Sequence, residues 1–585
     1  MELAAKLLRF ADCRALDAAS IAAGLPERQL MGQAALASFY ALDSSGALAR
    51  SNRVIILCGP GNNGGDGYAL GYMLAGAAPE SAGGARQSPL SIEVYASAPP
   101  KSEAARFYAE RLHKLCEPCE GRTDDGESRP RSGRAPRVSI GDAADFLRME
   151  PEALHATDCL MIEALLGIGQ NEAPRGTIAR VLAHITNLQR QTGVHTVSLD
   201  VPVGLREDAP ADDARELLVP DEIHSYGVDK AALRLEPRIA AGSLVRVLAM
   251  GFLPGAQYQT AADTPVIQSL GFAGKSREPL RALTDRPSLA HKYQAGHGLL
   301  IGGSPGMEGA LMMAARAFFA AGGGILHAIV PNAESRKFLT TALPGVMFLD
   351  HSKALPDSLR PRSIAIGPGL APEDLEATIE LLAPLFARMA PAPETNDGRK
   401  GRLDAAPAAP WLILDAGALA FAKDARFPES LRARSILTPH TGEWKRLGGA
   451  PIDCVNALEA AARMHAREIG GYCLVKDAVS ALLPPNHETP IGIRHRPNPA
   501  LAVAGSGDNL CGILTALFAR RDDSGAAFSP VQKIAAALEI LDGAARLEHH
   551  PRADQFPDLI RRSLESGAGS DAAGREDRPA WSQIL

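Results

Sequence analysis

The chain has 585 residues, too many for one ordinary domain of about 100 to 200 residues, so a single compact domain is excluded. Its net charge of −6 is small for this length and is not gathered in a basic stripe, which argues against nucleic acid as a partner. With 46% hydrophobic residues the chain can build packed cores, so disorder along its whole length is excluded.

No segment has the pattern of a membrane span or a secretory signal. The most apolar stretch, residues 309–330, contains Arg316 and His327, so we expect a buried helix, a turn and a strand there. Charged residues occur within the first dozen positions, which argues against a signal peptide and leaves the cytoplasm as the expected location. Cys116 and Cys119 form an isolated CxxC pair, for which we predict no zinc site.

The order of the predicted elements indicates an α/β fold that occurs twice along the chain. A helix is predicted from about Ala11 to Tyr40. Short apolar runs, each followed by a longer stretch of helical period, then indicate parallel strands. The predicted strands are 53–58, 91–96, 159–165 and 194–200 in the first half, and 297–303, 325–331, 363–369, 411–417, 434–440 and 472–477 in the second. We therefore expect two three-layer domains in tandem.

The domain boundary is predicted within residues 251–280, where Gly, Pro, Gln and Thr mix without clear periodicity. The two domains then cover residues 1–250 and 275–565, and residues 566–585 form a disordered tail. Three polar segments, 79–90, 117–137 and 391–409, are predicted to be solvated insertions that carry no chemistry.

The first chemical motif is GPGNNGGDG at residues 59–67, which follows a predicted strand and precedes a helix expected to begin near Tyr68. Glycine lets the backbone approach a ligand, and amides at a helix start can bind phosphate oxygens. A purely structural glycine turn is the alternative interpretation. Asn62, Asn63 and Asp66 favour a ligand site, because they add acceptors for a hydroxyl-rich ligand or a monovalent cation.

Two further motifs follow predicted strands of the first half. EALLGIGQNEAPRG at 163–176 leaves its strand through glycines and places Arg175 where it can meet a phosphate. SLDVPVGL at 198–205 ends an apolar strand with Asp200. A carboxylate at that edge of an open sheet is positioned for acid–base chemistry, although a capping aspartate is an equal alternative.

Taken in this order, the three motifs resemble the N-terminal domain of bifunctional NAD(P)H-hydrate repair enzymes, a Rossmann-like NAD(P)HX epimerase, over residues 10–250. The resemblance implies that Asp200 is the proton carrier. The residues that would hold the hydrated dinucleotide are Asn62, Asn63, Gly64, Gly65, Asp66, Gly167, Ile168, Gly169, Gln170 and Arg175.

The same resemblance implies a potassium ion, and two of its ligand positions are Asn63 and Glu163. The third position, a serine in the family, is Val203, which has no side-chain donor atom. This departure argues against potassium binding.

The second half contains a denser set of glycine-led turns. Residues 291–324 and 367–370 provide two of them, and residues 436–447 place His440 just past a strand. Gly505, Ser506, Gly507 and Asp508 stand at the start of a helix, where amides can hold a phosphoryl group and Asp508 can take a proton from a hydroxyl. The alternatives are a capping role for Asp508 and a backbone-satisfied His440.

This set of turns is similar to the ribokinase-like ADP/ATP-dependent NAD(P)H-hydrate dehydratases over residues 285–550. By that resemblance the hydrated cofactor contacts Ala310, Gly369, His440 and Asp508. The adenine nucleotide would contact Lys476, Asp477, Ala478, Val479, Ser480 and Gly507. Three positions depart from the family pattern: Gly417 replaces an aspartate, Asp477 replaces a glycine, and Ala371 replaces the last glycine of GPGLG.

The two resemblances imply a bifunctional enzyme that epimerises R and S NAD(P)HX and dehydrates the S form with ADP or ATP, with Mg²⁺ on the nucleotide phosphates. We expect a homo-oligomer with no nucleic-acid or membrane partner. One alternative is a small-molecule kinase with a non-catalytic dinucleotide-binding N-terminal domain. Another is decay of both sites, against which Asp200, His440 and Asp508 argue.

Overall fold

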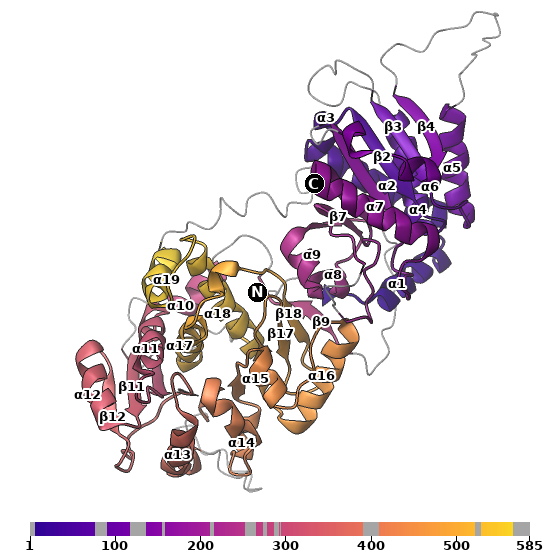
Figure 1. Ribbon diagram of the computed structural model, residues 1–585. Helices are drawn as coiled ribbons and strands as arrows, with labels where there is room; N and C mark the ends of the chain where they lie inside the picture. The colour runs from indigo at the N-terminus through magenta and orange to yellow at the C-terminus, as the bar shows by residue number, and fades with distance from the viewer. Residues whose placement is uncertain are drawn as a thin grey trace, which may run out of the picture. The chain divides into compact units, whose positions relative to one another are not determined.

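The computed structural model describes residues 6–76, 90–116, 136–154, 158–210, 216–251, 265–272, 278–285, 292, 294–389, 409–520 and 528–565. These residues divide into two units, one formed mainly by residues 7–251 and the other mainly by residues 265–565 (Figure 1). The predicted insertions and tail lie, except at their margins, outside the described residues. Each unit is described below by itself.

The first unit contains a seven-stranded sheet in the order β4-β3-β2-β5-β6-β7-β8, in which every neighbouring pair is parallel. The four strands predicted for this half are confirmed as β2 (Arg53–Cys58), β3 (Ser91–Ala96), β5 (Cys159–Ala164) and β6 (His195–Leu199). The sequence analysis missed β4 (Arg137–Asp142), β7 (Glu222–Tyr226) and β8 (Leu244–Leu248).

Strand β7 was missed because its buried positions are polar. Glu222 accepts a hydrogen bond from His224 at 2.9 Å and forms an ion pair with Arg246 of β8. A buried strand whose charges satisfy one another has no apolar pattern for a sequence reading to detect.

Helices cover both faces of the first sheet. One core cluster joins Val54 and Ile56 of β2 to α2 and α4, while Ile55 and Leu57 of the same strand belong to a second cluster with α7. This alternation confirms a three-layer domain. The helices are α1 (Phe10–Ala22), α2 (Glu27–Ser44), α3 (Ala47–Arg50), α4 (Asn62–Gly76), α5 (Glu103–Cys116), α6 (Ala143–Leu147), α7 (Gly176–Thr192), α8 (Ala231–Leu235) and α9 (Pro237–Gly242).

The single helix predicted from Ala11 to Tyr40 is wrong, since the chain forms α1 and α2 there. Gly24 has a φ of 103°, a conformation that ends a right-handed helix, and Pro26 caps the start of α2.

The second unit contains the strand order β9-β18-β17-β16-β15-β14-β13-β10-β11-β12. The pairs from β12 to β16 are parallel, and β17 adds an antiparallel hairpin to β16. All six predicted strands are present: β10 (His297–Ile301), β11 (Ile325–Val330), β13 (Ser363–Ile366), β14 (Trp411–Leu414), β15 (Ser435–Leu437) and β16 (Tyr472–Val475). The sequence analysis missed β9 (Ile267–Ser269), β12 (Met347–Asp350), β17 (Ser480–Leu483) and β18 (Ile491–Arg494).

The longest apolar segment of the sequence is confirmed as a helix and a strand, α11 (Glu308–Ala320) and β11. In the part of the chain that the structure describes, no helix is both long and apolar enough to cross a bilayer. The other helices of this unit are α10 (Glu278–Thr284), α12 (Ala333–Ala342), α13 (Leu375–Met389), α14 (Glu429–Arg432), α15 (Thr441–Arg446), α16 (Val455–Glu468), α17 (Ser506–Ala519), α18 (Pro530–Ala545) and α19 (Phe556–Glu565).

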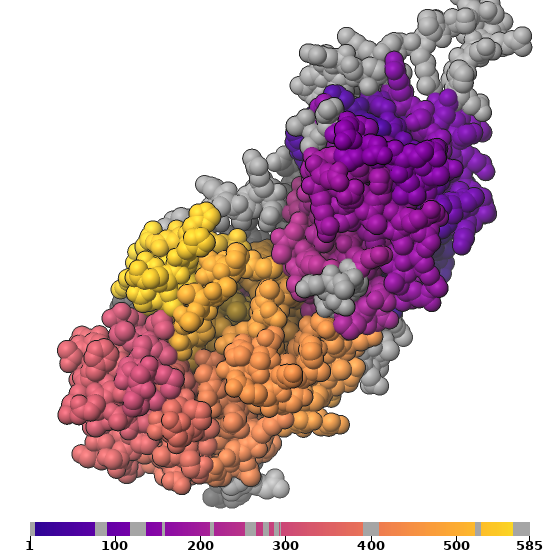
Figure 2. Space-filling model, in the orientation of Figure 1, coloured from indigo at the N-terminus to yellow at the C-terminus, as the bar shows by residue number. Residues whose placement is uncertain are grey.

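The core of the second unit lies mainly between its sheet and helices α11, α17, α18 and α19. Leu300 of β10 packs in this core, while Leu299 and Ile301 on the opposite face are also fully buried. The sheet is therefore covered on both faces, and side chains fill the spaces between the ribbons on the face seen in Figure 2.

Both sheets have a point where successive connections leave in opposite directions. In the first unit it lies between the neighbours β2 and β5, and in the second between β10 and β13. Ligands of open α/β sheets bind outside the carboxyl ends of the strands at such points. The predicted glycine motifs follow these four strands, so the topology brings them to the two expected binding edges.

Candidate active sites

The first glycine motif lets two loops approach each other after β2 and β5. A Cβ atom on Gly59 would lie 1.7 Å from the carbonyl oxygen of Leu165, and one on Gly64 would lie 1.9 Å from that of Gly59. Helix α4 begins at Asn62, inside the motif, and not near Tyr68 as predicted. The predicted residues Asn62 to Asp66 therefore form the first turns of this helix, where amide groups lack intrahelical acceptors.

The three predicted motifs of the first unit meet at one point. A Cβ atom on Gly167 would lie 3.3 Å from Cβ of Asn63 and 3.6 Å from Oδ2 of Asp200. Asn63, Gly167 and Asp200 are each more than 30 residues apart in sequence, so the sheet edge brings them together.

Asp200 adopts an uncommon backbone conformation and pairs with a buried lysine. Its φ is 62°, in the left-handed region that is costly for most residues, and such strain concentrates at functional sites. The Nζ atom of Lys230 lies 2.8 Å from Oδ1 of Asp200 and also donates to Ser225 at 2.9 Å. The sequence analysis assigned no role to Lys230, because it lies beyond β7 in a segment without a local motif.

Carboxyl groups surround this ion pair. Burial, reinforced by Asp200, raises the pKa of Asp17 to about 6 and that of Asp66 well above its usual value. Burial alone would lower the pKa of Lys230, but Asp200, together with Cys13 and Asp229, raises it. Lys230 is therefore a stable positive charge among three carboxyl groups, some of which can hold a proton near neutral pH.

The other predicted residues of this unit have local partners. Gln170 donates to the carbonyl of Pro202 at 3.0 Å and accepts from the amide of Gly204 at 2.8 Å, so it ties the second glycine loop to the turn after Asp200. Asn62 donates to Glu27 at 2.7 Å. Arg175 is 78% exposed and forms an ion pair with Glu172. The carbonyl of Ile168 accepts from Arg14. Gly169 stands beside these residues with open space around it.

The residues around Glu163 do not form the potassium site that the resemblance implies. Its two carboxyl oxygens accept hydrogen bonds from the amide of Leu165 at 2.7 Å, the hydroxyl of Ser198 at 2.7 Å and the amide of Val203 at 3.2 Å. Asn63 offers one buried oxygen without a partner among the described residues. A cation needs several oxygen ligands, whereas this site supplies mainly N–H and O–H donors.

Replacing Glu163 with glutamine is expected to remove a pH dependence of stability. Burial raises the pKa of Glu163 from 4.5 to about 7 in the folded chain. The unfolded chain ionises first as pH rises, so Glu163 contributes a fall of roughly 3 kcal/mol to the wild-type free energy of unfolding between these values. Urea unfolding at pH 5 and pH 8 measures the total fall, which should be smaller by about that amount in the glutamine variant and unchanged in the exposed control Glu110→Gln. An unchanged difference in Glu163→Gln would contradict the assignment.

In the second unit, polar side chains gather where β14, β15 and β16 end. Asp415 follows β14 and accepts from Thr438, which follows β15, at 2.6 Å. Lys476 follows β16, and its Nζ lies 3.1 Å from Oδ1 of Asp415. Asp415 is 3% exposed and the side chain of Lys476 is 24% exposed, so this is a second pair of a buried carboxylate with a lysine. The sequence analysis assigned Lys476 to the nucleotide and missed Asp415, although an apolar strand ending in aspartate is the signal that identified Asp200.

Helix α17 begins beside this pair, as predicted from its glycine motif. Gly505 precedes the helix with a φ of 97°, and a Cβ atom on Gly507 would lie 3.1 Å from Nζ of Lys476. Burial, with a smaller contribution from Asp415, raises the pKa of Asp508 from 3.8 to about 6. Free amide groups, a lysine ammonium and a carboxyl group that titrates near neutrality therefore face one another.

The glycine turns after β10 and β13 are tightly interlocked. Gly369 has a φ of 63°, and a Cβ atom there would lie 3.1 Å from that of Ala310, so two predicted substrate residues are neighbours. A Cβ atom on Gly417 would lie 2.5 Å from the carbonyl oxygen of Leu370. The aspartate that the family has at position 417 would therefore clash in this chain.

Alanine at position 367 is expected to destabilise the second unit. Gly367 has a φ of 134°, and a Cβ atom would lie 1.8 Å from the carbonyl oxygen of Asp415, which no side-chain movement can relieve. We expect Gly367→Ala to lower the free energy of unfolding by about 3 kcal/mol. Thermal unfolding measures the loss. Gly345→Ala is the matched control, because its nearest contact would be an ordinary 3.8 Å to Phe319. Equal stability of the two variants would refute the argument.

His440 caps helix α15. Its Nδ1 accepts from the amide of Gly442 at 3.0 Å, and its own amide donates to Glu443 at 2.9 Å. This is the backbone-satisfied arrangement considered as the alternative. The ring is 57% exposed, and its Nε2 atom lies 3.6 Å from Oε1 of Glu443.

The residues from Asp477 to Ser480 form the turn between β16 and β17. Asp477 is exposed and accepts from the amide of Ala478 at 2.7 Å, while the Ser480 hydroxyl donates to the carbonyl of Asp477. The carboxylate that replaces the family's glycine is thus held by its own turn. Val479 lies in the same turn, half-buried.

Two family models match the chain, one in each unit. The model described as YjeF-related protein N-terminus matches residues 27–232, and the NAD(P)H-hydrate dehydratase model matches residues 298–552. Similar proteins include two named bifunctional NAD(P)H-hydrate repair enzyme. The one from Salinibacter ruber is 28% identical and aligns with 95% of this chain and 94% of its own length. The one from Moorella thermoacetica is also 28% identical and aligns with 80% of this chain and 79% of its own.

Solved structures resemble part of the chain. The ADP/ATP-dependent NAD(P)H-hydrate dehydratase from Bacillus subtilis, co-crystallised with ATP and Mg²⁺, is 24% identical, covers 51% of this chain and 98% of its own, and has a TM-score of 0.39. A ribokinase-like superfamily protein from Enterococcus faecalis is 21% identical, covers 53% of this chain and 99% of its own, and has a TM-score of 0.40.

Proposed function

Because the chain belongs to the bifunctional NAD(P)H-hydrate repair family, we propose that Asp200 and Asp508 are the acid–base groups of its two steps. The steps are epimerisation of hydrated NADH or NADPH in the first unit and nucleotide-dependent dehydration in the second. One observation carries this assignment: each unit has a lysine–carboxylate pair at the edge where its sheet binds ligands, Lys230 with Asp200 in the first, and Lys476 with Asp415 in the second, where α17 with Asp508 begins beside the pair.

In the first unit, Asp200 would take the proton of the substrate hydroxyl. The hydrated carbon of the nicotinamide ring carries both a hydroxyl and the ring nitrogen, so removing the hydroxyl proton lets the carbon–nitrogen bond open. Closure on the other face of the carbonyl, with return of the proton, gives the opposite configuration. Lys230 pairs with Asp200, and Asn63 and the amides of Gly167 and Gly64 would provide the polar contacts for the dinucleotide.

In the second unit, Asp508 would accept the proton of the same hydroxyl as its oxygen attacks the terminal phosphorus of ADP or ATP. The bond from that phosphorus to the bridging oxygen breaks, which leaves AMP or ADP. The phosphate then departs with the carbon–oxygen bond electrons while the neighbouring carbon loses a proton, and the ring double bond returns. Lys476 and the first amides of α17 would stabilise the charge on the transferred group.

Mg²⁺ bound to the nucleotide would neutralise phosphate charge. Mg²⁺ on nucleotide phosphates usually takes one or two carboxylates from the protein, and Asp415 is the carboxylate at this edge that would hold it, which leaves Asp508 as the base. We infer no potassium role, because Glu163 already accepts three hydrogen bonds. The choice between ADP and ATP, the homo-oligomer and the cytoplasmic location remain predictions.

The proposal is tested by supplying separated R and S hydrates to the full chain, with and without ADP or ATP. We expect the S hydrate to return to reduced cofactor only with nucleotide, and the R hydrate to be converted to S without it. Faster phosphorylation of a vitamin or sugar alcohol than of hydrated NADH would instead support the kinase alternative. If the R hydrate is converted to the S hydrate no faster with the protein than without it, the first unit would have only a binding role.

A further inference from the structure

A cavity of about 200 Å³ lies at the other end of the second unit's sheet. Its lining begins where the strands begin: Arg362 precedes β13, Trp411 opens β14 and Arg434 precedes β15. Phe518 and Arg520 come from the end of α17, and Pro530 and Lys533 from the start of α18. Asp508 stands in the first turn of α17, so the 14-residue helix separates the cavity from the dehydratase site by about 20 Å.

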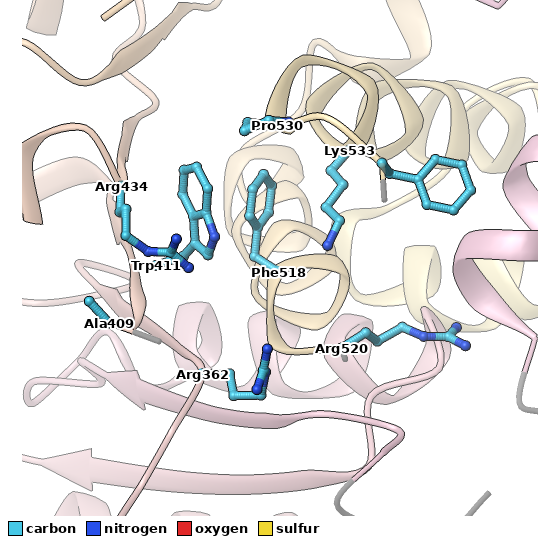
Figure 3. A pocket seen from close by; sticks show the side chains of 9 residues that line it. Arg362, Ala409, Trp411, Arg434, Phe518, Arg520, Pro530 and Lys533 are labelled. Carbon is cyan, nitrogen blue, oxygen red and sulfur yellow. The ribbon is translucent and has the colours of Figure 1, made fainter. Parts of the chain in front are cut away.

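The cavity is strongly basic. Of the nine described residues that line it, Arg362, Arg434, Arg520 and Lys533 are cationic and none is acidic. Arg520 donates to the carbonyl oxygens of Leu283 and Asp285, and Figure 3 shows its side chain directed away. Arg362 and Lys533 are directed into the cavity from opposite sides in the same view.

Two of these cations have unmet hydrogen-bonding capacity. The buried Nε atoms of Arg362 and Arg434 have no hydrogen-bond partner among the described residues. Buried N–H groups of a guanidinium are almost always paired, so these unpaired groups add to the cost of burying the two cations.

The cations also repel one another. Burial lowers the pKa of Arg434, and the charge of Arg362 lowers it further. The guanidinium carbon of Arg434 lies 4.9 Å from the ring centre of Trp411, and Nζ of Lys533, on a residue only 6% exposed, lies 5.5 Å from that of Phe518. Aromatic faces attract cations but leave the total charge unchanged.

We propose that this cavity is a binding site for a small phosphate-type anion, separate from the dehydratase site. Guanidinium N–H groups and an ammonium group suit the oxygens of a tetrahedral dianion. The volume is below the 300–1,000 Å³ that drug-sized ligands usually occupy, so a dinucleotide is excluded and inorganic phosphate or a compact phosphorylated metabolite fits. The anion would offset the repulsion among these cations. This inference does not depend on the chemistry proposed for Asp200 or Asp508.

The test is calorimetric titration of the full chain with inorganic phosphate at constant ionic strength, with ADP and Mg²⁺ saturating so that the nucleotide site is filled. We expect one phosphate site, weakened at least about tenfold in Arg434→Gln. Arg467→Gln, whose side chain is 78% exposed on α16, should bind like the wild type. A parallel titration with glycerol phosphate distinguishes the two ligands, inorganic phosphate and a phosphorylated metabolite. If glycerol phosphate binds more tightly than inorganic phosphate, the ligand is a phosphorylated metabolite.

Thermal unfolding supplies an independent readout. Without added anion, Arg434→Gln should melt at or above the wild-type temperature because one repelling charge is gone, and phosphate should raise the melting temperature of the wild type only. Arg362→Gln serves in the same way if Arg434→Gln fails to fold. Absence of phosphate binding by the wild type, or equal binding by the wild type and the folded glutamine variant, would overturn the proposal.

Discussion

Asp508→Asn is expected to lower kcat of the dehydratase step by about a thousandfold while the Kd of the nucleotide changes by no more than a few-fold. The substitution removes the proposed proton acceptor but keeps the size of the side chain and the α17 amides that we propose bind phosphate. Steady-state recovery of reduced cofactor from the S hydrate gives kcat, and titration with ADP gives Kd.

The pH profile adds a second readout for Asp508. Its pKa is raised to about 6, and a base must be deprotonated, so wild-type kcat/KM should fall as pH drops below about 6. Asp558→Asn, on a residue whose side chain is 72% exposed in α19, should keep both rate and profile. Turnover of Asp508→Asn at the wild-type rate would remove this residue from its proposed role.

Asp200→Asn is expected to lower the rate of R-to-S conversion by about a thousandfold while the dehydration of the S hydrate is unchanged. Asparagine tolerates the left-handed conformation at a φ of 62°, so the turn should persist. The amide cannot accept the hydroxyl proton as a carboxylate does, and Lys230 loses its charged partner. Chiral analysis of the hydrate in the absence of nucleotide measures the conversion.

Asp43→Asn, in α2, is the matched control for this measurement and should epimerise like the wild type. A normal epimerisation rate in Asp200→Asn would show that the proton is carried by another group, of which Asp17 and Asp66 are the nearest candidates by their raised pKa values.

The parts of the fold that the sequence predicts are those with a strong local signal. Strands such as β2 and β14 are apolar runs that end in glycine or aspartate, and the structure confirms them. The break between α1 and α2 was missed although Gly24 and Pro26 mark it, because the apolar period continues on both sides. Strand β7 gave no signal, since its buried Glu222 and His224 are stabilised by partners rather than by apolar packing.

The candidate sites show the same limit. Asp200 and Asp508 each stand in a motif that the residues alone make conspicuous. Lys230 stands in no such motif. It follows β7 and lies beside Asp200 because β7 pairs in parallel with β6, a long-range contact that one sequence cannot reveal. The basic cavity was likewise invisible, because Arg362, Arg434 and Lys533 are far apart in sequence and meet only at the amino ends of the strands.

Complementation between two inactive chains tests the central claim, that each unit performs one step with its own carboxyl group. Recovery of reduced-cofactor absorbance is followed from the pure R hydrate with ADP and Mg²⁺, for Asp200→Asn, for Asp508→Asn and for an equal mixture of the two. Each variant alone should stay at the uncatalysed rate, and the mixture should recover the cofactor, because one chain releases the S hydrate and the other dehydrates it. Full recovery by either variant alone, or none by the mixture, would contradict the account.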